Sequence, residues 1–293
     1  MERLLSNIPL EHLERWENSI GTIFFVVALG LLVLEGVRYA FRRELTWRLV
    51  GDSLTNYLTF GFFIVLNYGL LGLLYLGTYF AAAPFALFDI PTTWVSLLAC
   101  LVLADFAYYW EHRFTHRVNA AWATHSVHHS SPYFNLSVAN RFGPMDGIWP
   151  IFFHLPLVLL GFDPLLVLFC EIVVLQYQTF LHTEAIGKLP RLIEAVFNTP
   201  SHHRVHHGAN PEYIDRNYAG ILIVWDRLFG TFAEERATVR YGLTAPIDTV
   251  NPFRVFFGGL ARLGSAVLGA KSLRGVTHAL VAPPEAVVVD ERG

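Results

Sequence analysis

The chain has 293 residues, of which 54% are hydrophobic and only 15% are charged, and its net charge is −3. A water-soluble domain of this length needs more charge to cover its surface, so the composition indicates a membrane protein. The negative balance and the lack of a basic stripe interleaved with aromatic residues exclude nucleic acid as a partner.

Three apolar runs in the first part of the chain are long enough to cross a bilayer as helices, which takes roughly 20 residues. They cover residues 19–37, 54–80 and 92–110. The first run follows a polar segment unlike a secretory signal peptide, so we expect it to remain as an anchor. Cys100 and Cys170 both lie in apolar surroundings, where we expect small buried hydrophobic residues and neither a disulfide nor a thiolate metal site.

Two further apolar regions follow. Residues 148–181 are divided by Pro156 and by a turn-like sequence at 161–164, which predicts a helical hairpin with two short arms. Residues 252–269 mix large apolar residues with arginine and predict a helix lying in the membrane interface, with a spanning helix as the alternative. A loose tail is expected at 281–293. The expected fold is all-α, an integral membrane bundle of about four to five apolar helices with a histidine-rich helical cap.

The distribution of arginine predicts the orientation of this bundle. The loop between the first two runs contains four arginines, whereas residues 81–91 contain neither lysine nor arginine. Basic loops favour the cytoplasm, so counting spans from there places the cap, with its histidines, on the cytoplasmic side. The arginines of the basic loop are Arg38, Arg42, Arg43 and Arg48.

Nine of the thirteen histidines fall within residues 112–129 and 202–207, far more than chance allows. Their order is H-x3-H, then H-x2-H-H, then a distant H-x2-H-H. Residues three or four apart share a helix face, so each group presents its imidazoles together. One tetrahedral metal site takes four ligands, and eight therefore predict two neighbouring metal ions. The eight predicted ligands are His112, His116, His125, His128, His129, His203, His206 and His207.

This order of histidine boxes resembles the fatty acid hydroxylase/sterol desaturase superfamily of integral membrane di-iron oxygenases. Residues 122–141, 198–208 and 217–232 are most similar to the branch that contains the alkylglycerol monooxygenases, and 241–253 continue the similarity. The resemblance implies two iron ions (Fe2+) held by histidine, with O2 as co-substrate. It also implies His182 as a ninth ligand.

The resemblance divides the chain into anchor helices at 1–92, a di-iron catalytic domain at 93–253, and an interfacial helix and tail at 254–293. Two departures from the animal members matter. They carry Glu where this chain has Arg117, and they are longer, with additional membrane segments. The pterin cofactor and the substrate of that branch are therefore left open for this chain.

Several other residues are candidates for supporting roles. Asp105 precedes His112 on the same helix face and is expected to orient a ligand imidazole as an outer acceptor. Gln178 is a candidate to hold a metal-bound water, and whether His202 joins the metal site is open. The remaining candidates are Tyr108, Tyr109 and Trp110 for a lipid entry or an interfacial belt, Arg141 for a lipid headgroup, and Asn217 and Asp226 for packing around the site.

The expected function is an O2-dependent di-iron monooxygenase that inserts oxygen into a C–H bond of a membrane lipid, with alkyl-ether cleavage as one version. A sterol or fatty acyl desaturase using the same site is the alternative. A metal transporter is a remote third, because transport sites lie at mid-membrane and these boxes do not. The sequence shows no haem domain, flavin fingerprint or cysteine set, so we expect electrons from a separate redox protein or a diffusible reductant such as a pterin.

Overall fold

The structure, a computed structural model, describes residues 7–67, 69 and 72–287, and the regular elements in these ranges are helical, which confirms the all-α prediction. The α-helices are α2 (Leu10–Arg42), α3 (Trp47–Leu66), α4 (Gly72–Ala82), α5 (Trp94–Arg117), α6 (Asn119–His125), α7 (Trp149–Leu160), α8 (Pro164–Thr179), α9 (Arg191–Val196), α10 (Pro200–His206), α11 (Val224–Leu228), α12 (Pro252–Gly269) and α13 (Leu273–Val281). The 3-10 turns are η2 (Ala83–Phe85), η3 (His128–Ser130), η4 (Leu136–Asn140) and η5 (Pro284–Ala286).

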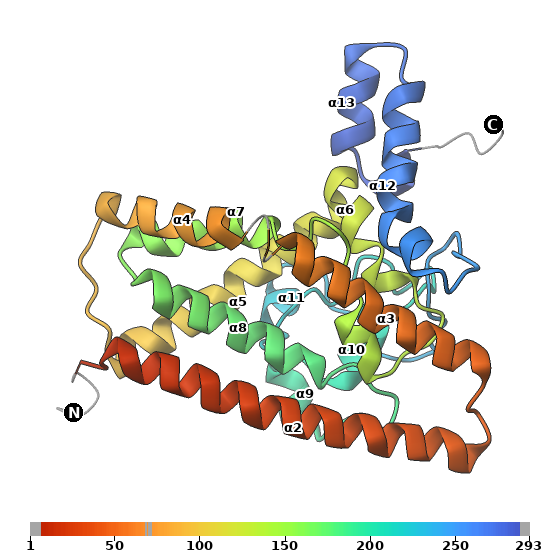
Figure 1. Cartoon of the computed structure of the whole chain (residues 1–293), viewed down its shortest axis with the longest axis horizontal. Helices are drawn as coiled ribbons and strands as arrows, with labels where there is room; N and C mark the ends of the chain where they lie inside the picture. The colour runs from red at the N-terminus through yellow and green to blue at the C-terminus, as the bar shows by residue number, and fades with distance from the viewer. Residues whose placement is uncertain (1–6, 68, 70–71, 288–293) are drawn as a thin grey trace.

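Three helices are long and apolar enough to cross a membrane: Asn18–Arg42 within α2, α3 and α5. The apolar part of α2 is almost entirely exposed, as expected of a helix that faces lipid. Helix α5 begins at a capping box, in which Ser96 N donates to Thr93 Oγ1 (3.2 Å) and Thr93 N donates to Ser96 Oγ (2.7 Å). Because α5 extends from this cap to Arg117, it leads from the bundle into the histidine-rich region (Figure 1).

The second apolar run is described as helix on both sides of a short gap. Helix α3 ends at Leu66, Asn67 and Gly69 are π-helical, and α4 starts at Gly72. The side-chain amide of Asn67 donates to Phe63 O (3.0 Å) and Pro144 O (3.3 Å), which ties the end of α3 to a loop. Helix α4 packs against α7, and a single span over 54–80 stays a prediction, because part of the segment between α3 and α4 lies outside the described residues.

The hairpin predicted for residues 148–181 is confirmed as α7 and α8. Gly161 ends α7 with φ of 123°, a left-handed conformation that favours glycine, and the Asp163 side chain accepts from Leu165 N (2.8 Å) to start α8. Pro156 does not divide α7 as expected. Because α7 and α8 both pack on α5, this hairpin and α5 form the centre of the bundle.

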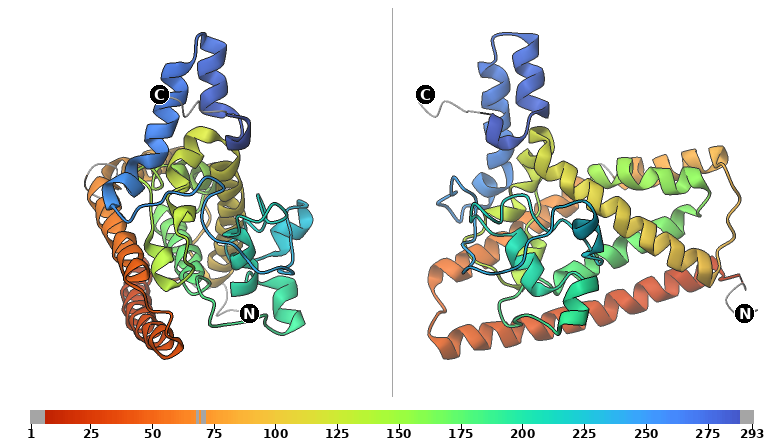
Figure 2. Two further views of the ribbon diagram at one scale, coloured as in Figure 1. Left: turned by 90° about the vertical axis from the view of Figure 1, so that its right-hand side faces the viewer. Right: turned by 180° about the vertical axis from the view of Figure 1, so that it is seen from behind.

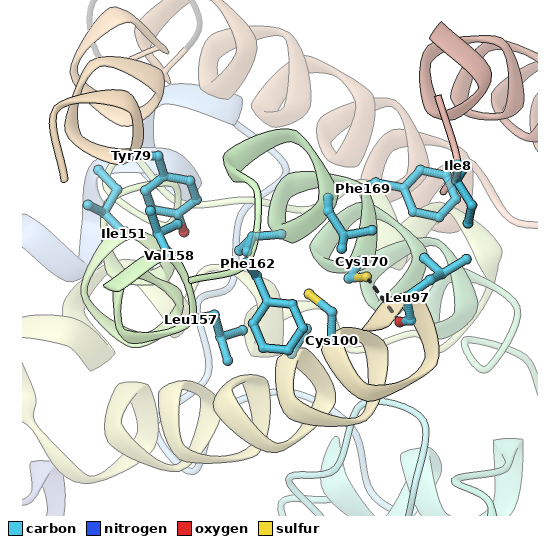
Figure 3. Packing of buried hydrophobic residues seen from close by; sticks show 13 residues of the cluster. Ile8, Tyr79, Leu97, Cys100, Ile151, Leu157, Val158, Phe162, Phe169 and Cys170 are labelled. Carbon is cyan, nitrogen blue, oxygen red and sulfur yellow. Dashed lines mark hydrogen bonds between the residues drawn. The ribbon is translucent and has the colours of Figure 1, made fainter. Parts of the chain in front are cut away.

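The bundle interior is a cluster of buried apolar side chains from α4, α5, α7 and α8 (Figure 3). Cys100 and Cys170 lie in it as free thiols, and Cys170 Sγ donates to Leu97 O (3.9 Å). The prediction that both cysteines act as small buried hydrophobic residues is therefore confirmed.

The predicted C-terminal helix over 252–269 is present as α12, but it does not lead into a simple tail. It turns back into α13, and the two form a hairpin that projects sideways from the bundle, crosswise to α2 and α3 (Figure 1, Figure 2). Residues 288–293 of the predicted tail lie outside the described residues. The division of the chain at residues 92 and 253 stays a prediction.

Candidate metal centre

Helix α5 supplies the first two histidines of the site. His112 and His116 are one turn apart on its last turns, and both are buried. Their imidazole centroids are 5.2 Å apart, so the two rings share a face as the spacing predicted. This face turns toward α6 and α10, because both helices carry histidines that contact it.

The second box does not lie on one helix. Helix α6 ends at His125, and a 3-10 turn begins at His128. In an unbroken helix, His125, His128 and His129 would all point the same way. The expected helical arc of three histidines is thus interrupted after His125 in this box.

The third box lies at the end of α10. His203 and His206 belong to its last turn, and His207 is the residue that ends the helix, with φ and ψ of −80° and 1°. Asn217 Nδ2 donates to His202 O (3.1 Å), so this short helix is held by a neighbouring loop. All three histidines of this box are buried.

The structure gathers the nine predicted ligands into two groups whose nitrogen atoms lie within 4.8 Å of one another. We name them cluster A and cluster B. Both clusters consist of imidazoles alone, without a carboxylate. Cluster A contains His112, His116, His125, His129 and His206. Cluster B contains His128, His182, His203 and His207.

Hydrogen bonds in cluster B leave lone pairs pointing at one another. His128 Nδ1 donates to Arg141 O (3.1 Å) and His182 Nδ1 donates to Gln178 O (2.9 Å), so each neutral ring carries its proton on Nδ1. Their two Nε2 atoms are nonetheless 3.2 Å apart, and His203 Nε2 is 3.0 Å from that of His182. Two lone pairs at this separation repel unless a cation lies between them. Ligands about 2 Å from one metal ion are separated by about 3 Å, so the geometry fits a metal site.

Cluster A is organised in the same way from another loop. His112 Nδ1 donates to Tyr218 O (2.9 Å) and His206 Nδ1 donates to Arg216 O (3.0 Å). Their Nε2 atoms therefore carry lone pairs that face the cluster. Within the described residues, the buried nitrogens without a protein partner include His116 Nε2, His129 Nε2, His206 Nε2, His207 Nε2 and His203 Nδ1. Buried polar atoms are rarely left unpaired, so this concentration of unpaired nitrogens supports metal binding.

A strained loop holds the carbonyl groups that orient cluster A. Asp215 and Asn217 both have positive φ (59° and 57°), a conformation that these residue types tolerate best after glycine. Asn217 also donates to Ala233 O (2.8 Å), while the Asp226 carboxylate accepts from Tyr218 N (2.8 Å). The expected packing roles of Asn217 and Asp226 agree with these bonds.

Burial keeps the candidate ligands neutral. Removal from water lowers the pKa of each cluster histidine that lies outside α5. Neighbouring imidazoles lower most of these pKa values further. The pKa of His128 falls to about 4. Neutral imidazole is the form that binds metal, so the site is ready for a metal ion at pH 7 without losing protons first.

Among the residues that the structure describes, Asp215 is the carboxylate that faces a candidate ligand of cluster A closely. Its Oδ1 lies 3.7 Å from His116 Nδ1, and its other oxygen pairs with Arg117. Burial raises the pKa of Asp215, but the bonds to His116 and Arg117 outweigh burial and lower it to about 2. Asp215 therefore stays ionised and is placed to orient His116.

Asp105 does not have its expected role. Its carboxylate accepts from Ile221 N (2.6 Å), Leu222 N (3.0 Å) and Trp225 Nε1 (2.9 Å), and so fixes the loop before α11. That loop continues from the one that orients His112. Asp105 thus supports the site through the backbone, and the expectation of direct contact with an imidazole was wrong.

The structure shows where His202 and Gln178 lie relative to the two clusters. His202 lies outside both clusters, with Nε2 3.2 Å from Glu194 Oε2. Gln178 accepts from His182 through its backbone carbonyl, while its side chain donates to Val174 O (3.2 Å). Gln178 therefore orients a candidate ligand by its main chain, and its role toward a bound water stays a prediction.

Arg141 does not face a lipid headgroup. Its side chain is 1% exposed, and Nη1 donates to Asp52 Oδ1 (3.0 Å) and Asn56 Oδ1 (2.6 Å) on α3. Its Nε donates to Val127 O (3.0 Å), and its carbonyl accepts from His128. Arg141 therefore links a membrane helix to cluster B, and the headgroup expectation was wrong.

A cavity of about 240 Å³ reaches cluster A from the surface. His116, His129 and His206 form part of its wall, and Trp122 lies beside them. The aromatic residues expected at an entry are placed elsewhere. Tyr109, for example, is buried and shares a hydrogen bond with Thr231 (3.0 Å). The remaining lining residues are His207, Gly208, Ala209, Ile214, Asp215, Gly242, Leu243, Thr244, Ala245, Arg262, Pro284 and Glu285.

Known proteins match the part of the chain that contains the clusters. Over 166 residues the chain is 49% identical to alkylglycerol monooxygenase of Danio rerio, a match that covers 57% of this chain and 36% of that protein. It is 32% identical to ornithine lipid hydroxylase of Rhizobium tropici, over 45% of this chain and 40% of that protein. It is 25% identical to lathosterol oxidase of Homo sapiens, over 51% and 48%. No solved structure matches the chain.

The chain thus spans little more than a third of the length of the alkylglycerol monooxygenase it matches. Residues 97–231 match the model of the fatty acid hydroxylase family. This segment includes all nine histidines of clusters A and B. Residues 97–231, a little under half of the chain, are therefore similar to the fatty acid hydroxylase family.

Proposed function

We propose that this protein is a membrane-bound, O2-dependent oxygenase that inserts oxygen into a C–H bond of a lipid and holds two iron ions in clusters A and B. The observation that carries the proposal is the pair of buried, all-imidazole clusters within the matched segment. Imidazole suits iron as a ligand, and two adjacent sites suit a reaction that needs more than one electron. The proposed localisation is multi-pass in the membrane, with the clusters on the cytoplasmic side.

When bound, the iron ions and O2 would supply an oxidant able to remove hydrogen from an unactivated C–H bond. The chain's own residues orient the candidate imidazole ligands and enclose the site. The carbonyls of Tyr218, Arg216, Arg141 and Gln178 fix the imidazole tautomers, so each Nε2 faces the cluster without rearrangement. Burial of the histidines excludes bulk water from the reacting position.

As the substrate we propose a lipid with an alkyl-ether bond, because the alkylglycerol monooxygenase of Danio rerio is nearly half identical to this chain over the shared segment. Hydroxylation of the carbon next to the ether oxygen gives a hemiacetal, which separates into an aldehyde and an alcohol. One oxygen atom of O2 enters the lipid and the other leaves as water. The reaction therefore consumes two electrons, which we assign to a separate redox protein or a diffusible reductant such as a pterin.

A second candidate is sterol or fatty acyl desaturation by the same site. The chain is similar to lathosterol oxidase at lower identity, and this similarity supports desaturation as a second candidate. Hydroxylation and desaturation begin with the same removal of hydrogen and differ only in whether oxygen is then transferred. The histidine geometry supports both reactions equally.

Comparative lipid mass spectrometry of cells with and without the protein tests the proposal. A lipid class that gains the mass of one oxygen atom supports hydroxylation and identifies the substrate. Loss of alkyl-ether lipids with release of matching aldehydes supports ether cleavage, whereas loss of two hydrogen atoms supports desaturation. An unchanged lipid profile combined with purified protein that binds no iron would contradict the proposal.

A further inference from the structure

The hairpin of α12 and α13 is the part of the molecule that reaches farthest from the helical bundle. It extends sideways, crosswise to the spanning helices α2 and α3, and all views show this arrangement (Figure 1, Figure 2). A body whose helices cross a bilayer therefore carries this hairpin along the plane of the membrane. A hairpin with this direction presents its whole length to a lipid surface parallel to it.

The base of the hairpin is fixed to the cap and to α3. Val255 and Phe256 are buried, and Phe62 of α3 packs against the Phe256 ring (5.5 Å between centroids). Gly259 lies so close to α6 that an added Cβ would be 1.8 Å from Ala123 O. Only glycine allows this approach, so the base forms a close helix contact and the tip projects from a fixed support.

The charge of the hairpin has one sign. Residues 251–281 contain no aspartate or glutamate, although the whole chain has a net charge of −3. They contain Arg254, Arg262, Lys271 and Arg274. Such a surface is complementary to anionic headgroups, and each basic residue near them contributes about 1 kcal/mol at ordinary ionic strength.

The tip combines this charge with apolar side chains that nothing in the described chain covers. Leu268 is 88% exposed and Leu273 is 83% exposed, on either side of the turn. Lys271 lies in the turn, Arg274 lies in the first turn of α13, and both are exposed. Apolar side chains next to cations are the pattern of helices that lie in a membrane interface.

We propose that the α12–α13 hairpin docks on anionic lipid headgroups, with Leu268 and Leu273 entering the boundary of the acyl chains and Lys271 and Arg274 binding the headgroups. A second copy of this hairpin is disfavoured as the occupant, because two surfaces with only positive charge repel each other. The lipid surface needs no separate encounter, because the spanning helices already hold the hairpin beside it. This proposal does not depend on the proposed function.

Docking has a consequence for the cavity over cluster A. Arg262 of α12 and the residues Pro284 and Glu285 after α13 form part of the cavity wall, together with His116 and His129. A hairpin held at the headgroups therefore fixes one wall of this cavity at the membrane surface. An entrance to cluster A then lies beside the layer from which a lipid substrate would come.

The test uses the full chain in nanodiscs, with Leu268→Cys carrying an environment-sensitive fluorophore. The native thiols, Cys100 and Cys170, are buried and should not react. We expect blue-shifted emission and quenching by headgroup-proximal lipid quenchers in phosphatidylcholine discs containing about 30 mol % phosphatidylglycerol, and much less of both in phosphatidylcholine alone. The double variant Lys271→Glu/Arg274→Glu should weaken docking by more than tenfold, at about fivefold per basic residue removed.

Two controls make the result specific. A fluorophore at Glu212→Cys, an exposed site on the cap, should not respond to lipid charge, and Arg191→Glu should leave the Leu268 signal unchanged. An unchanged thermal midpoint for the double variant would show that it remains folded. Emission that is independent of lipid charge, or shielding that occurs only when two copies share a disc, would overturn the proposal. The second outcome would assign the tip to self-association.

Discussion

Clusters A and B share the two H-x2-H-H boxes and yet differ in how they are supported. Cluster A has five histidines and takes its orienting carbonyls from the loop at 215–218. Cluster B has four and takes its carbonyls from Arg141 and from the end of α8. Cluster A also borders the 240 Å³ cavity with three of its histidines, whereas cluster B contributes His207 alone.

The difference arises because the chain divides each H-x2-H-H box between the clusters. His128 belongs to cluster B while its neighbour His129 belongs to cluster A. His206 belongs to cluster A while His207 belongs to cluster B. Neither cluster can therefore form from one box alone, and the two must assemble together. Adjacent residues of one box then serve as matched probes of the two clusters.

Removal of one ligand from each cluster should give the largest effect. We expect His206→Ala and His207→Ala each to lower turnover by at least about 100-fold, because ligands matter more than the outer partners that already cost 10–100-fold. Each variant should lose mainly one of the two metal ions, which metal analysis of the purified protein would measure. His129→Ala and His128→Ala repeat the comparison from the second box. Full activity in any of the four variants would break the two-cluster assignment.

Acid should empty both clusters. The histidines of both clusters beyond α5 have a lowered pKa in the folded protein, so they take up protons less readily than in the unfolded chain, where the pKa is about 6.5. The unfolded chain therefore binds more protons as the pH falls below about 6.5, and stability decreases from there toward the pKa of about 4 at His128. Bound metal should be released over this range. Metal content and the thermal midpoint measured between pH 7 and pH 4 test this, and a midpoint that rises on acidification would contradict it.

Replacement of Arg141 should weaken metal binding in cluster B before cluster A. Arg141→Ala leaves Asp52 buried without its partner, which typically costs about 3–5 kcal/mol of stability. It also frees the loop whose carbonyl orients His128, so cluster B should lose metal before cluster A. Thermal unfolding and metal content provide the measurement. Replacing Arg141 and Asp52 together should recover part of the stability, and a double variant as unstable as the single one would argue against the ion pair.

Replacement of Asp215 should weaken metal binding in cluster A and leave cluster B unchanged. Asp215→Asn keeps the side-chain shape but removes the charge beside His116, and we expect metal affinity of cluster A to fall about 10–100-fold. Cluster B should keep its metal, because Asp215 has no contact with its histidines in the described structure. Metal titration of the variant resolves the two sites. Equal weakening of both would show that the clusters share their support.

Spacing in the sequence predicted that eight histidines converge, the family resemblance added His182, and the structure brings all nine together. Spacing could not predict how they divide, because each H-x2-H-H box contributes to both clusters and only the fold places the boxes against one another. The orienting acceptors were also missed, since every residue has a backbone carbonyl and only the fold selects Arg216 and Tyr218. The positive φ values of Asp215 and Asn217 mark that loop, and an Asp and an Asn two residues apart were the one available signal.

The buried position of Arg141 was missed for a related reason. Asp52, its partner, is 89 residues away and lies just before the apolar run at 54–80, where sequence patterns do not reveal pairing. Asp105 illustrates the converse case. Its position on the helix face was predicted correctly, but its carboxylate oxygens accept hydrogen bonds from backbone N–H groups of a loop near residue 221. No local sequence pattern places that loop beside Asp105. Local periodicity thus predicts which face a residue occupies and not which distant segment covers that face.

His202 should give the smallest effect and so mark the boundary of the site. Its ring pairs with Glu194 and packs on Phe232 (5.5 Å between centroids), and it belongs to neither cluster. Glu194 keeps its bonds to Ser201 when His202 is removed, so His202→Ala should leave the metal content unchanged, although the loss of this buried ring lowers the stability. The neighbouring variant His203→Ala, which removes a candidate ligand, is the matched control. If His202→Ala instead lost metal as His203→Ala should, the clusters would extend beyond the nine histidines, and their division into five and four would be wrong.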